Sequence, residues 1–296
     1  MKILITGSNG LLGQRLSAIA IERGLSIWRT DIDEPVNQEN YVQLDLTDQE
    51  GLLSACERLR PETIINCAAI TDVDLCERDK NLASSVNSEV PLYLSESSNV
   101  IGAHLIHIST DYVFDGKKGL YSEEDEPRPI NHYGFSKLRG ETHVKSTARS
   151  WSIARTSVVF GWGREKRPNF ATWVIKGLRN RNNLNVVIDQ FASPTLNTNL
   201  AEMLLELAER RLQGIYHLAG KDRTDRFSMA VRMADEFGLD KTLLTPASSD
   251  GIRWLARRPK DSSLNVRKAV AELKSAPMGL DRALREMRLT ENKEKD

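Results

Sequence analysis

The sequence has no net charge, few cysteines and no long hydrophobic run among its 296 residues. Lysine and arginine together number 41, as do aspartate and glutamate, so a basic surface for nucleic acids or acidic membranes is not indicated. The three cysteines are an odd number without a C-x-x-C pair, which argues against a disulfide framework or a cysteine-bound zinc ion. No apolar run approaches the ~20 residues of a membrane span, and the apolar N-terminus ends at residues 6–10, too early for a signal peptide. We therefore expect a cytoplasmic protein that binds neither nucleic acid nor membrane.

The histidines and acidic residues show no metal-binding pattern either. The five histidines lack the spacing of metal ligands, and His107, in a predicted buried strand, is expected to be a hydrogen-bonded core residue. Asp72, Asp74 and Glu77 have the chemistry to bind a divalent ion, but such a cluster more often forms a solvated loop face. The sequence thus predicts no metal site.

The chain does contain short apolar runs that alternate with segments of helical periodicity. This alternation is typical of strands buried on both faces of a parallel sheet, with helices between them. The expected strands are 2–6, 26–30, 41–44, 63–69, 104–110, 151–159, 185–188 and 215–218. The expected helices are 11–20, 52–59 after a capping box at 47–50, 82–100, 133–146, 170–178, 199–211, 228–237, 266–273 and 280–287. The predicted fold class is α/β, a Rossmann-type doubly wound parallel sheet with a smaller, mostly helical substrate-binding lobe.

The regularity of this alternation predicts the domain division. Residues 1–164 and about 185–220 are expected to form the dinucleotide-binding domain. Segments of about 165–184 and 221–289 are expected to form the substrate-binding lobe, and 290–296 a flexible tail.

Glycines lie three apart in the turn after the first strand, at Gly7, Gly10 and Gly13. Such glycines allow a tight turn, close approach of the backbone to a pyrophosphate, and packing of helix on strand. A glycine triplet alone is weak evidence, because a plain turn uses the same residues. Its place between strand and helix strengthens it, as does Asp31 at the end of the second strand, where a carboxylate accepts from ribose hydroxyls and repels a 2′-phosphate.

NAD(H) is therefore the favoured cofactor. NADP(H) is the open alternative, because Arg29 could turn to cover a 2′-phosphate, although a solvated arginine at a strand end is the commoner arrangement. Asp45, at the end of the third strand, is expected to meet the adenine edge unless it only begins a polar loop. The candidate cofactor-binding residues are Gly7, Asn9, Gly10, Leu11, Leu12, Gly13, Asp31, Asp45, Leu46, Cys67, Ala68, Ala69, Tyr133 and Lys137.

A tyrosine and a lysine four residues apart, Tyr133 and Lys137, share one face of a predicted helix. A phenol is a poor acid or base at neutral pH, but a nearby ammonium stabilises the phenolate and lowers the pKa of the phenol. That arrangement suits a general acid for carbonyl reduction. The pair by itself is weak evidence; the hydroxyl of Thr110, at the carboxyl end of the preceding strand where such sheets bind ligands, strengthens it.

With these residues in view, the chain resembles the extended, nucleotide-sugar-modifying short-chain dehydrogenase/reductases, and within them the dTDP-4-dehydrorhamnose reductase family. The run 109–116 (STDYVFDG) and the later Arg258–Pro259 pair are the most specific marks. The resemblance is carried by segments in order along nearly the whole chain: 66–69 with Asp74 and Glu77, 109–116, Tyr133 and Lys137, 155–157, 169–170, 189–195 and 258–264.

The resemblance implies reduction of the 4-keto group of a dTDP-6-deoxyhexose by NAD(P)H, with dTDP-L-rhamnose or a close analogue as product. It implies that Tyr133 donates a proton, that Lys137 holds the nicotinamide ribose and lowers the pKa of the tyrosine, and that Thr110 bonds the carbonyl oxygen. Family members are often homodimers, which leaves a homodimer open. The implied substrate-binding residues are Thr110, Asp111, Tyr112, Asn169, Gln190 and Arg258; interdomain ion pairing and loop packing are the alternative for the last three.

Relatives with other activities remain to be separated. Dehydratases of this superfamily have Glu where this chain has Tyr112, so elimination is disfavoured, whereas a C4 epimerase stays open. A regulatory subunit, as in methionine adenosyltransferase beta, is a further alternative, although it need not retain Thr110, Tyr133 and Lys137. The chain departs from the family pattern in having Val158 and Val159, with Trp162 later, where reductases commonly have a sugar-lining Trp. The basic stretch 161–168 is an active-site lid or a solvated loop.

Overall fold

The computed structural model describes residues 1–34, 39–163 and 168–291. Seven parallel strands form the central sheet in the spatial order β11-β6-β5-β4-β1-β2-β3. This is the doubly wound arrangement that the alternating sequence pattern predicts, with β1 and β4 side by side where the strand order reverses. The strands are β1 (Lys2–Thr6), β2 (Ser26–Asp31), β3 (Tyr41–Gln43), β4 (Thr63–Asn66), β5 (His104–Thr110), β6 (Trp151–Thr156) and β11 (Gly214–His217).

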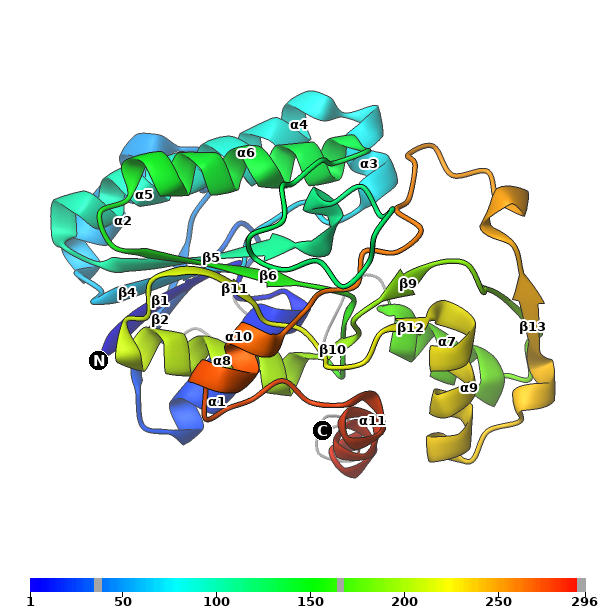
Figure 1. Ribbon diagram of the computed structural model, residues 1–296. Coiled ribbons are helices and arrows are strands. Elements are labelled where there is room, and N and C mark those ends of the chain that lie inside the picture. The colour runs from blue at the N-terminus through cyan, green and yellow to red at the C-terminus, as the bar shows by residue number, and fades with distance from the viewer. Residues whose placement is uncertain (35–38, 164–167, 292–296) are drawn as a thin grey trace.

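Helices cover both faces of the sheet, as Figure 1 shows. One face packs against α1 (Leu11–Glu22), α8 (Asn197–Arg210) and α10 (Arg267–Glu272). The other packs against α2 (Gln49–Leu59), α5 (Val90–Ile101) and α6 (His132–Thr147). Two apolar cores result, one on each side, because the strands carry apolar side chains in both directions. Short helices α3 (Val73–Arg78) and α4 (Lys80–Ser84) precede α5, and a 3-10 turn (Asp111–Val113) follows β5.

The smaller lobe has a third apolar core of its own, to the right in Figure 1. Its helices are α7 (Phe170–Arg179), α9 (Arg226–Phe237) and α11 (Leu280–Leu289). A parallel strand pair, β8 (Leu184–Val187) and β13 (Leu244–Ala247), lies along its outer side. Two further pairs join lobe and sheet: β7 (Val159–Phe160) with β10 (Thr195–Leu196), and β9 (Phe191–Ala192) with β12 (Thr224–Asp225). No helix of the described residues is long and apolar enough to cross a bilayer.

Several element boundaries differ from the expected ones for local reasons. The expected strand 151–159 is broken, because Val158 adopts a positive φ of 44° between β6 and β7. Asp48, not Thr47, caps α2 by accepting from the Gly51 amide. The expected helix 82–100 contains a π-helical stretch at Ser85–Glu89, and Pro91 lies in the first turn of α5, where a missing amide hydrogen costs nothing.

The cores also divide the chain differently from the expected domain boundaries. β8 was expected with the sheet, but Leu184 and Val186 are buried in the lobe core. α10 was expected in the lobe, but Ala269 and Leu273 are buried against the sheet. A short apolar helix can be covered by either layer, so its order in the chain does not decide its place. We propose a division in which β8 counts with the lobe and α10 with the sheet; the expected boundary at 164 and residues 292–296 of the expected tail lie outside the described residues.

Candidate functional site

The glycine-rich turn after β1 lies against the loop that follows β4. Gly7 has a φ of +61°, and a Cβ there would lie 2.6 Å from the backbone nitrogen of Ala68. A Cβ on Gly13 would lie 2.3 Å from the carbonyl oxygen of Gly7, so α1 meets the turn closely only because this residue is glycine. The turn and Cys67–Ala68 thus line the point where the strand order reverses, which is where doubly wound sheets bind dinucleotides.

Helix α1 begins here with an N-terminus that suits a phosphate. Gly10 is its N-cap; no side chain bonds the first amides, and the first turn contains no acidic residue. The free amides and the positive end of the helix dipole therefore point to where a pyrophosphate would lie. These residues fit a dinucleotide.

Asp31 lies beside this turn at the end of β2. Its carboxylate accepts hydrogen bonds from the backbone amides of Asn9 (2.9 Å) and Ile32 (2.8 Å). These bonds fix the Asp31 carboxylate beside the glycine-rich turn, and its contact with an adenosine ribose stays a prediction. Arg29 donates to the carbonyl of Glu39, so in this structure its guanidinium is directed along the strand edge.

Two residues that were expected to contact the cofactor have side chains with other partners in the structure. The Asp45 carboxylate accepts from the amide (2.9 Å) and the hydroxyl (2.7 Å) of Thr47, which closes a polar turn. The Leu46 side chain is buried in the core under α2 and α5. Asp45 therefore matches the alternative in which it begins a polar loop. Because the Leu46 side chain is buried, Leu46 can contact a cofactor only through its backbone.

The expected catalytic side chains come together at the carboxyl end of β5. Thr110 is its last residue; burial raises the pKa of the Tyr133 phenol on α6, and the nearby Thr110 hydroxyl lowers it. Asn131 caps α6 two residues before the tyrosine. One turn further along α6, the Lys137 ammonium is buried and donates to the carbonyl of Ile108 on β5 (2.7 Å).

Lys137 lies next to two hydrogen-bonded polar side chains, Asn66 at the end of β4 and His107 on β5. The Asn66 side-chain amide donates to Nδ1 of His107 (3.1 Å), so Nε2 carries the imidazole proton in the neutral ring. That Nε2 lies 3.4 Å from Nζ of Lys137. Burial, and then the charge on the lysine, hold the pKa of His107 well below its usual value. His107 is thus the hydrogen-bonded core histidine that was expected. Burial also lowers the pKa of Lys137, to about 8.

The expectation that Lys137 lowers the pKa of Tyr133 stays a prediction. Burial raises the pKa of the phenol, the Thr110 hydroxyl lowers it, and the Asp111 carboxylate adds to the rise. The Lys137 ammonium donates its hydrogen bond to the backbone of β5. The raised pKa keeps Tyr133 protonated at neutral pH, which is the state a proton donor needs.

A buried ion pair holds α6 against the sheet. Glu141, one turn beyond Lys137, accepts from both Nε (2.9 Å) and Nη2 (2.7 Å) of Arg155 on β6, and from the Ser109 hydroxyl (2.6 Å). The side chains of Glu141 and Arg155 are 0% and 1% exposed. The pair is bidentate and links α6, β5 and β6 in one place, which sets where the tyrosine and lysine stand relative to Thr110.

The Asp111 side chain is bonded inside the protein. Its buried carboxylate accepts from the hydroxyls of Ser157 (2.8 Å), Ser262 and Thr110 (3.1 Å). Burial raises the pKa of this carboxyl while the three hydroxyls oppose the rise. In place of the expected substrate contact, we propose that Asp111 is a structural link between β5, the β6–β7 turn and the segment that contains Ser262. Tyr112 does border the site, since its ring meets that of Tyr133 edge-on at 5.8 Å.

The three lobe residues expected at the substrate differ in their surroundings. Asn169 caps α7 through Ala171 and Thr172 and donates to the Gly161 carbonyl (2.8 Å), so its side chain is structural, which corrects its expected role. Gln190 is half-buried, and its amide bonds no other described residue. Arg258 forms an ion pair with Asp74 on α3 (3.0 Å) and lies 5.5 Å from the Trp254 ring.

Sequence reasoning missed Arg226, the first residue of α9. Its guanidinium stacks 5.0 Å above the Phe170 ring and acts on the Tyr112 hydroxyl, whose pKa burial raises and this guanidinium lowers. No spacing rule marks an arginine that far along the chain; only the fold brings it to the site. Trp162, in contrast, donates its indole proton to the Met287 carbonyl (2.7 Å) inside the lobe, so it does not replace the absent sugar-lining tryptophan.

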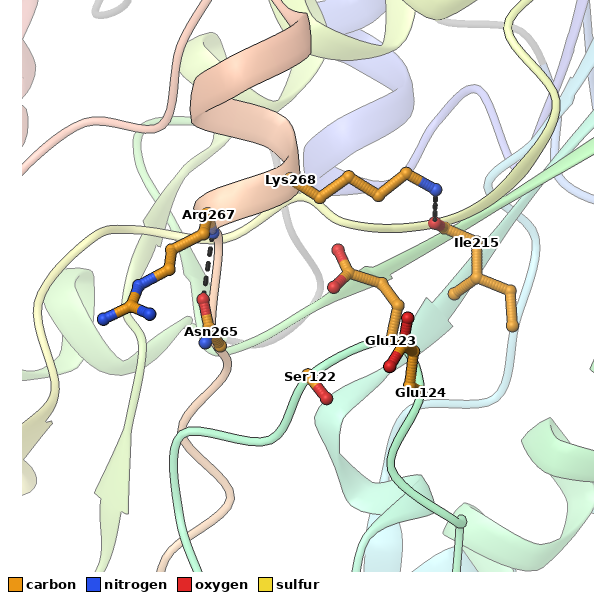
Figure 2. A pocket seen from close by; sticks show the side chains of 7 residues that line it. All are labelled: Ser122, Glu123, Glu124, Ile215, Asn265, Arg267 and Lys268. Atoms are coloured by element: carbon orange, nitrogen blue, oxygen red, sulfur yellow. Dashed lines mark hydrogen bonds between the residues drawn. The ribbon is translucent and has the colours of Figure 1, made fainter.

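A separate cavity of about 560 Å³ lies at the edge strand β11, away from these residues. Figure 2 shows the Lys268 ammonium reaching the Ile215 carbonyl (2.7 Å), and the Glu123 carboxylate accepts from the His217 amide (2.9 Å). These charged groups satisfy backbone groups on the open side of the strand and so protect the sheet edge from pairing with another chain. The cavity holds none of the expected catalytic residues.

Comparisons with known proteins agree with this geometry. The family model described as "RmlD substrate binding domain" matches residues 1–291. The dTDP-4-dehydrorhamnose reductase of Aggregatibacter actinomycetemcomitans is 32% identical, over 97% of this chain and 98% of the relative. The structure of the Bacillus anthracis dTDP-4-dehydrorhamnose reductase in complex with NADP is 30% identical, covers 97% of this chain and 98% of its own, and superposes with a TM-score of 0.88. Methionine adenosyltransferase 2 subunit beta of Mus musculus is 32% identical, over 90% of this chain and 81% of the relative.

Proposed function

We propose a function from the premise that this chain belongs to the RmlD substrate binding domain family, whose model matches residues 1–291. The protein is an NAD(P)H-dependent reductase that converts the 4-keto group of dTDP-4-dehydro-L-rhamnose to the alcohol of dTDP-L-rhamnose. The observation that carries the proposal is the meeting of Thr110, Tyr133 and Lys137 at the carboxyl end of β5, in the same sheet edge as the glycine-rich turn.

Each of the three side chains has one role in this reaction. The reduced nicotinamide supplies a hydride for the keto carbon. Tyr133, protonated because its site is buried, gives its proton to the oxygen of the keto group. Thr110 donates a hydrogen bond to the same oxygen, for which its hydroxyl has to turn from Asp111. The charge of Lys137 stabilises the phenolate that Tyr133 leaves behind and holds the nicotinamide ribose.

The cofactor is a nicotinamide dinucleotide held by the turn 7–13, the loop 67–69 and Lys137. NAD(H) is favoured because the Asp31 carboxylate is fixed by two backbone amides where a 2′-phosphate would have to lie. The Bacillus anthracis relative was solved in complex with NADP, so the preference has to be measured for this chain. The dTDP-sugar is the proposed partner, and Tyr112, Gln190, Arg226 and Arg258 are its proposed contacts. The cytoplasmic location and the homodimer stay predictions.

The direct test supplies dTDP-4-dehydro-L-rhamnose to the purified protein with NADH or NADPH, follows cofactor oxidation and identifies the product by NMR. We expect turnover to dTDP-L-rhamnose, with a higher kcat/KM for NADH than for NADPH because of Asp31. Oxidation of neither cofactor, despite binding of one of them, would contradict the proposed reaction.

The pH dependence of this activity follows from the buried lysine. Burial lowers the pKa of Lys137 to about 8, so its ammonium is present below that pH and is lost above it. We expect kcat/KM to fall by about tenfold per pH unit above 8, whereas a solvated lysine would keep its charge to a pH of about 10.4. Measuring kcat/KM from pH 6 to 10.5, with the stability of the protein checked at each pH, gives the midpoint of the fall. A rate that stays flat to pH 10 would show that the ammonium is not required.

The similarity to methionine adenosyltransferase 2 subunit beta keeps a regulatory subunit as the second candidate. Retention of Thr110, Tyr133 and Lys137 in one site favours the enzyme, because binding to a partner protein does not need a proton donor. Cofactor binding without turnover of any nucleotide sugar would favour the second candidate.

A further inference from the structure

A segment that returns from the lobe to the sheet is attached to α3 and to the residue that caps α6, next to Tyr133. This strap, residues 252–258, follows the 3-10 turn Ser249–Gly251 after β13; Figure 1 shows the chain leaving the lobe there and coming back beside α3. Trp254 and Arg258 are half-buried on it, whereas Leu255 is exposed. The strap contains no regular secondary structure, so its position depends on side chains from other elements.

Helix α3 supplies the main attachment through one carboxylate. Oδ1 of Asp74 accepts from the backbone amide of Ala256 (2.9 Å) and from Nη1 of Arg258 (3.0 Å). The same Nη1 donates to the Ala256 carbonyl (2.8 Å), which folds the arginine back over the strap. Only Nη1 is used in these contacts within the described residues, so the other guanidinium nitrogens keep their protons for an acceptor in the site.

The strap is also connected to the start of α6. The Asn131 side-chain amide donates to the Arg257 carbonyl (2.8 Å), while its Oδ1 caps α6 at the amide of Gly134 (2.9 Å). Glu77, one turn after Asp74 on α3, accepts from the amide of His132 (3.0 Å). The attachment of the strap therefore lies within two residues of Tyr133, so its position is coupled to that of the proton donor.

The strap carries a positive charge, Arg258, close to the residues of the site. Burial raises the pKa of the Tyr112 hydroxyl, and the charges of Arg226 and Arg258 lower it; the Tyr112 ring in turn contacts that of Tyr133. Burial by itself would raise the pKa of the Asp74 carboxyl, but the hydrogen bond from the Ala256 amide and the pairing with Arg258 together hold that pKa below its usual value.

We propose that Asp74 is a positioning residue that fixes the strap and aims Arg258 at the diphosphate of the nucleotide sugar. This inference rests on the proposed function, which supplies a ligand with a diphosphate. A guanidinium held at one nitrogen by a carboxylate presents its remaining N–H groups in a fixed plane, which suits a bidentate phosphate contact. Without Asp74, the strap loses its ion pair to α3, and Arg258 has to be ordered by the ligand itself, which weakens binding.

The test compares Asp74→Asn with Asp72→Asn in the full-length protein. Asparagine at 74 still accepts from the Ala256 amide but loses the charge that pairs with Arg258. Asp72 caps the same helix through the amides of Asp74 and Leu75, and asparagine is an equally good N-cap, so this variant removes one carboxylate charge from the same end of α3 while the cap is kept. Thermal melting of both variants checks that the fold is retained.

The first readout is direct binding by calorimetry, with saturating NADH present, of dTDP and of thymidine, which lacks the diphosphate. We expect Asp74→Asn to weaken dTDP binding about tenfold and leave thymidine binding unchanged, and Asp72→Asn to change neither. Asp74→Glu, which restores the charge, should recover part of the dTDP affinity. Equal weakening of dTDP and thymidine, or unchanged dTDP affinity, would overturn the proposal.

The second readout is catalytic and separates this inference from the proposed function. With dTDP-4-dehydro-L-rhamnose, Asp74→Asn should raise KM about tenfold with kcat within threefold and with unchanged affinity for NADH. A fall in kcat at unchanged KM would overturn the positioning role. Absence of turnover by the unaltered protein would count against the proposed reaction alone, because the dTDP binding difference is measured without turnover.

Discussion

Replacing Tyr133 by phenylalanine should lower kcat by about 10³-fold, within the 10²–10⁴-fold that a positioned general acid contributes. The substitution removes only the hydroxyl that gives a proton to the substrate oxygen, and it leaves the ring against Tyr112 at 5.8 Å. Binding of NADH and of dTDP should therefore change little. Steady-state reduction of dTDP-4-dehydro-L-rhamnose, with both binding constants measured beside it, checks this expectation.

Tyr93→Phe is the matched control for that variant. Tyr93 is a partly buried tyrosine on α5 that packs against the core beneath α2 and α5, a cluster that contains none of the expected catalytic residues. Its loss of a hydroxyl should leave kcat within twofold. If Tyr133→Phe kept more than a tenth of the activity, another group would have to supply the proton, and the assignment of Tyr133 would fail.

Replacing Glu141 by glutamine should destabilise the protein by about 3–5 kcal/mol, the usual cost of removing one partner of a buried ion pair. The Arg155 guanidinium would then remain charged and buried without a carboxylate, and among the described residues its Nη1 has no hydrogen-bond partner to begin with. Ser109 would lose an anionic acceptor as well. Denaturant unfolding at neutral pH measures the difference.

Glu286→Gln provides the comparison for Glu141→Gln, because Glu286 pairs with Arg282 on the exposed face of α11. Such a surface pair contributes about 0.3–0.5 kcal/mol, so this variant should unfold almost like the unaltered protein. Glu141 also raises the pKa of Lys137. Folded Glu141→Gln should therefore show the fall in kcat/KM at a pH below 8, a shift that a purely structural role would not produce.

The parts of the fold that follow local rules were predictable from sequence. The alternation of apolar runs and amphipathic segments predicted all seven strands of the central sheet, because parallel strands are buried on both faces and so are apolar throughout. The turn with Gly7 and Gly13 was predictable because only glycine tolerates such close backbone contacts. Boundaries such as the break at Val158 were not, since a single positive φ leaves no periodic trace.

The residues of the site were predictable only where their spacing, their place at a strand end or a family motif marked them. Tyr133 and Lys137 were found from their spacing and from the family pattern, and Thr110 from its place at a strand end. Asp111 and Asn169 belong to the same pattern, yet their polar atoms are used inside the protein, by Ser157 and Ser262 for the first and by the end of α7 for the second. A motif shared with a family does not tell whether a polar side chain faces the site or bonds inside the protein.

The sequence by itself determined the α/β class, the strand and helix order, the dinucleotide turn and the family to which the chain belongs, because these depend on patterns within a few residues or along the whole chain. Only the tertiary structure decided that Arg226 borders Tyr112, that Asp74 holds Arg258, and that the ammonium of Lys137 bonds the backbone of β5. These contacts join residues that are far apart in the chain or that choose between competing partners. Burial, charge and hydrogen-bond competition settle that choice, and they exist only once the sheet and the lobe have packed together.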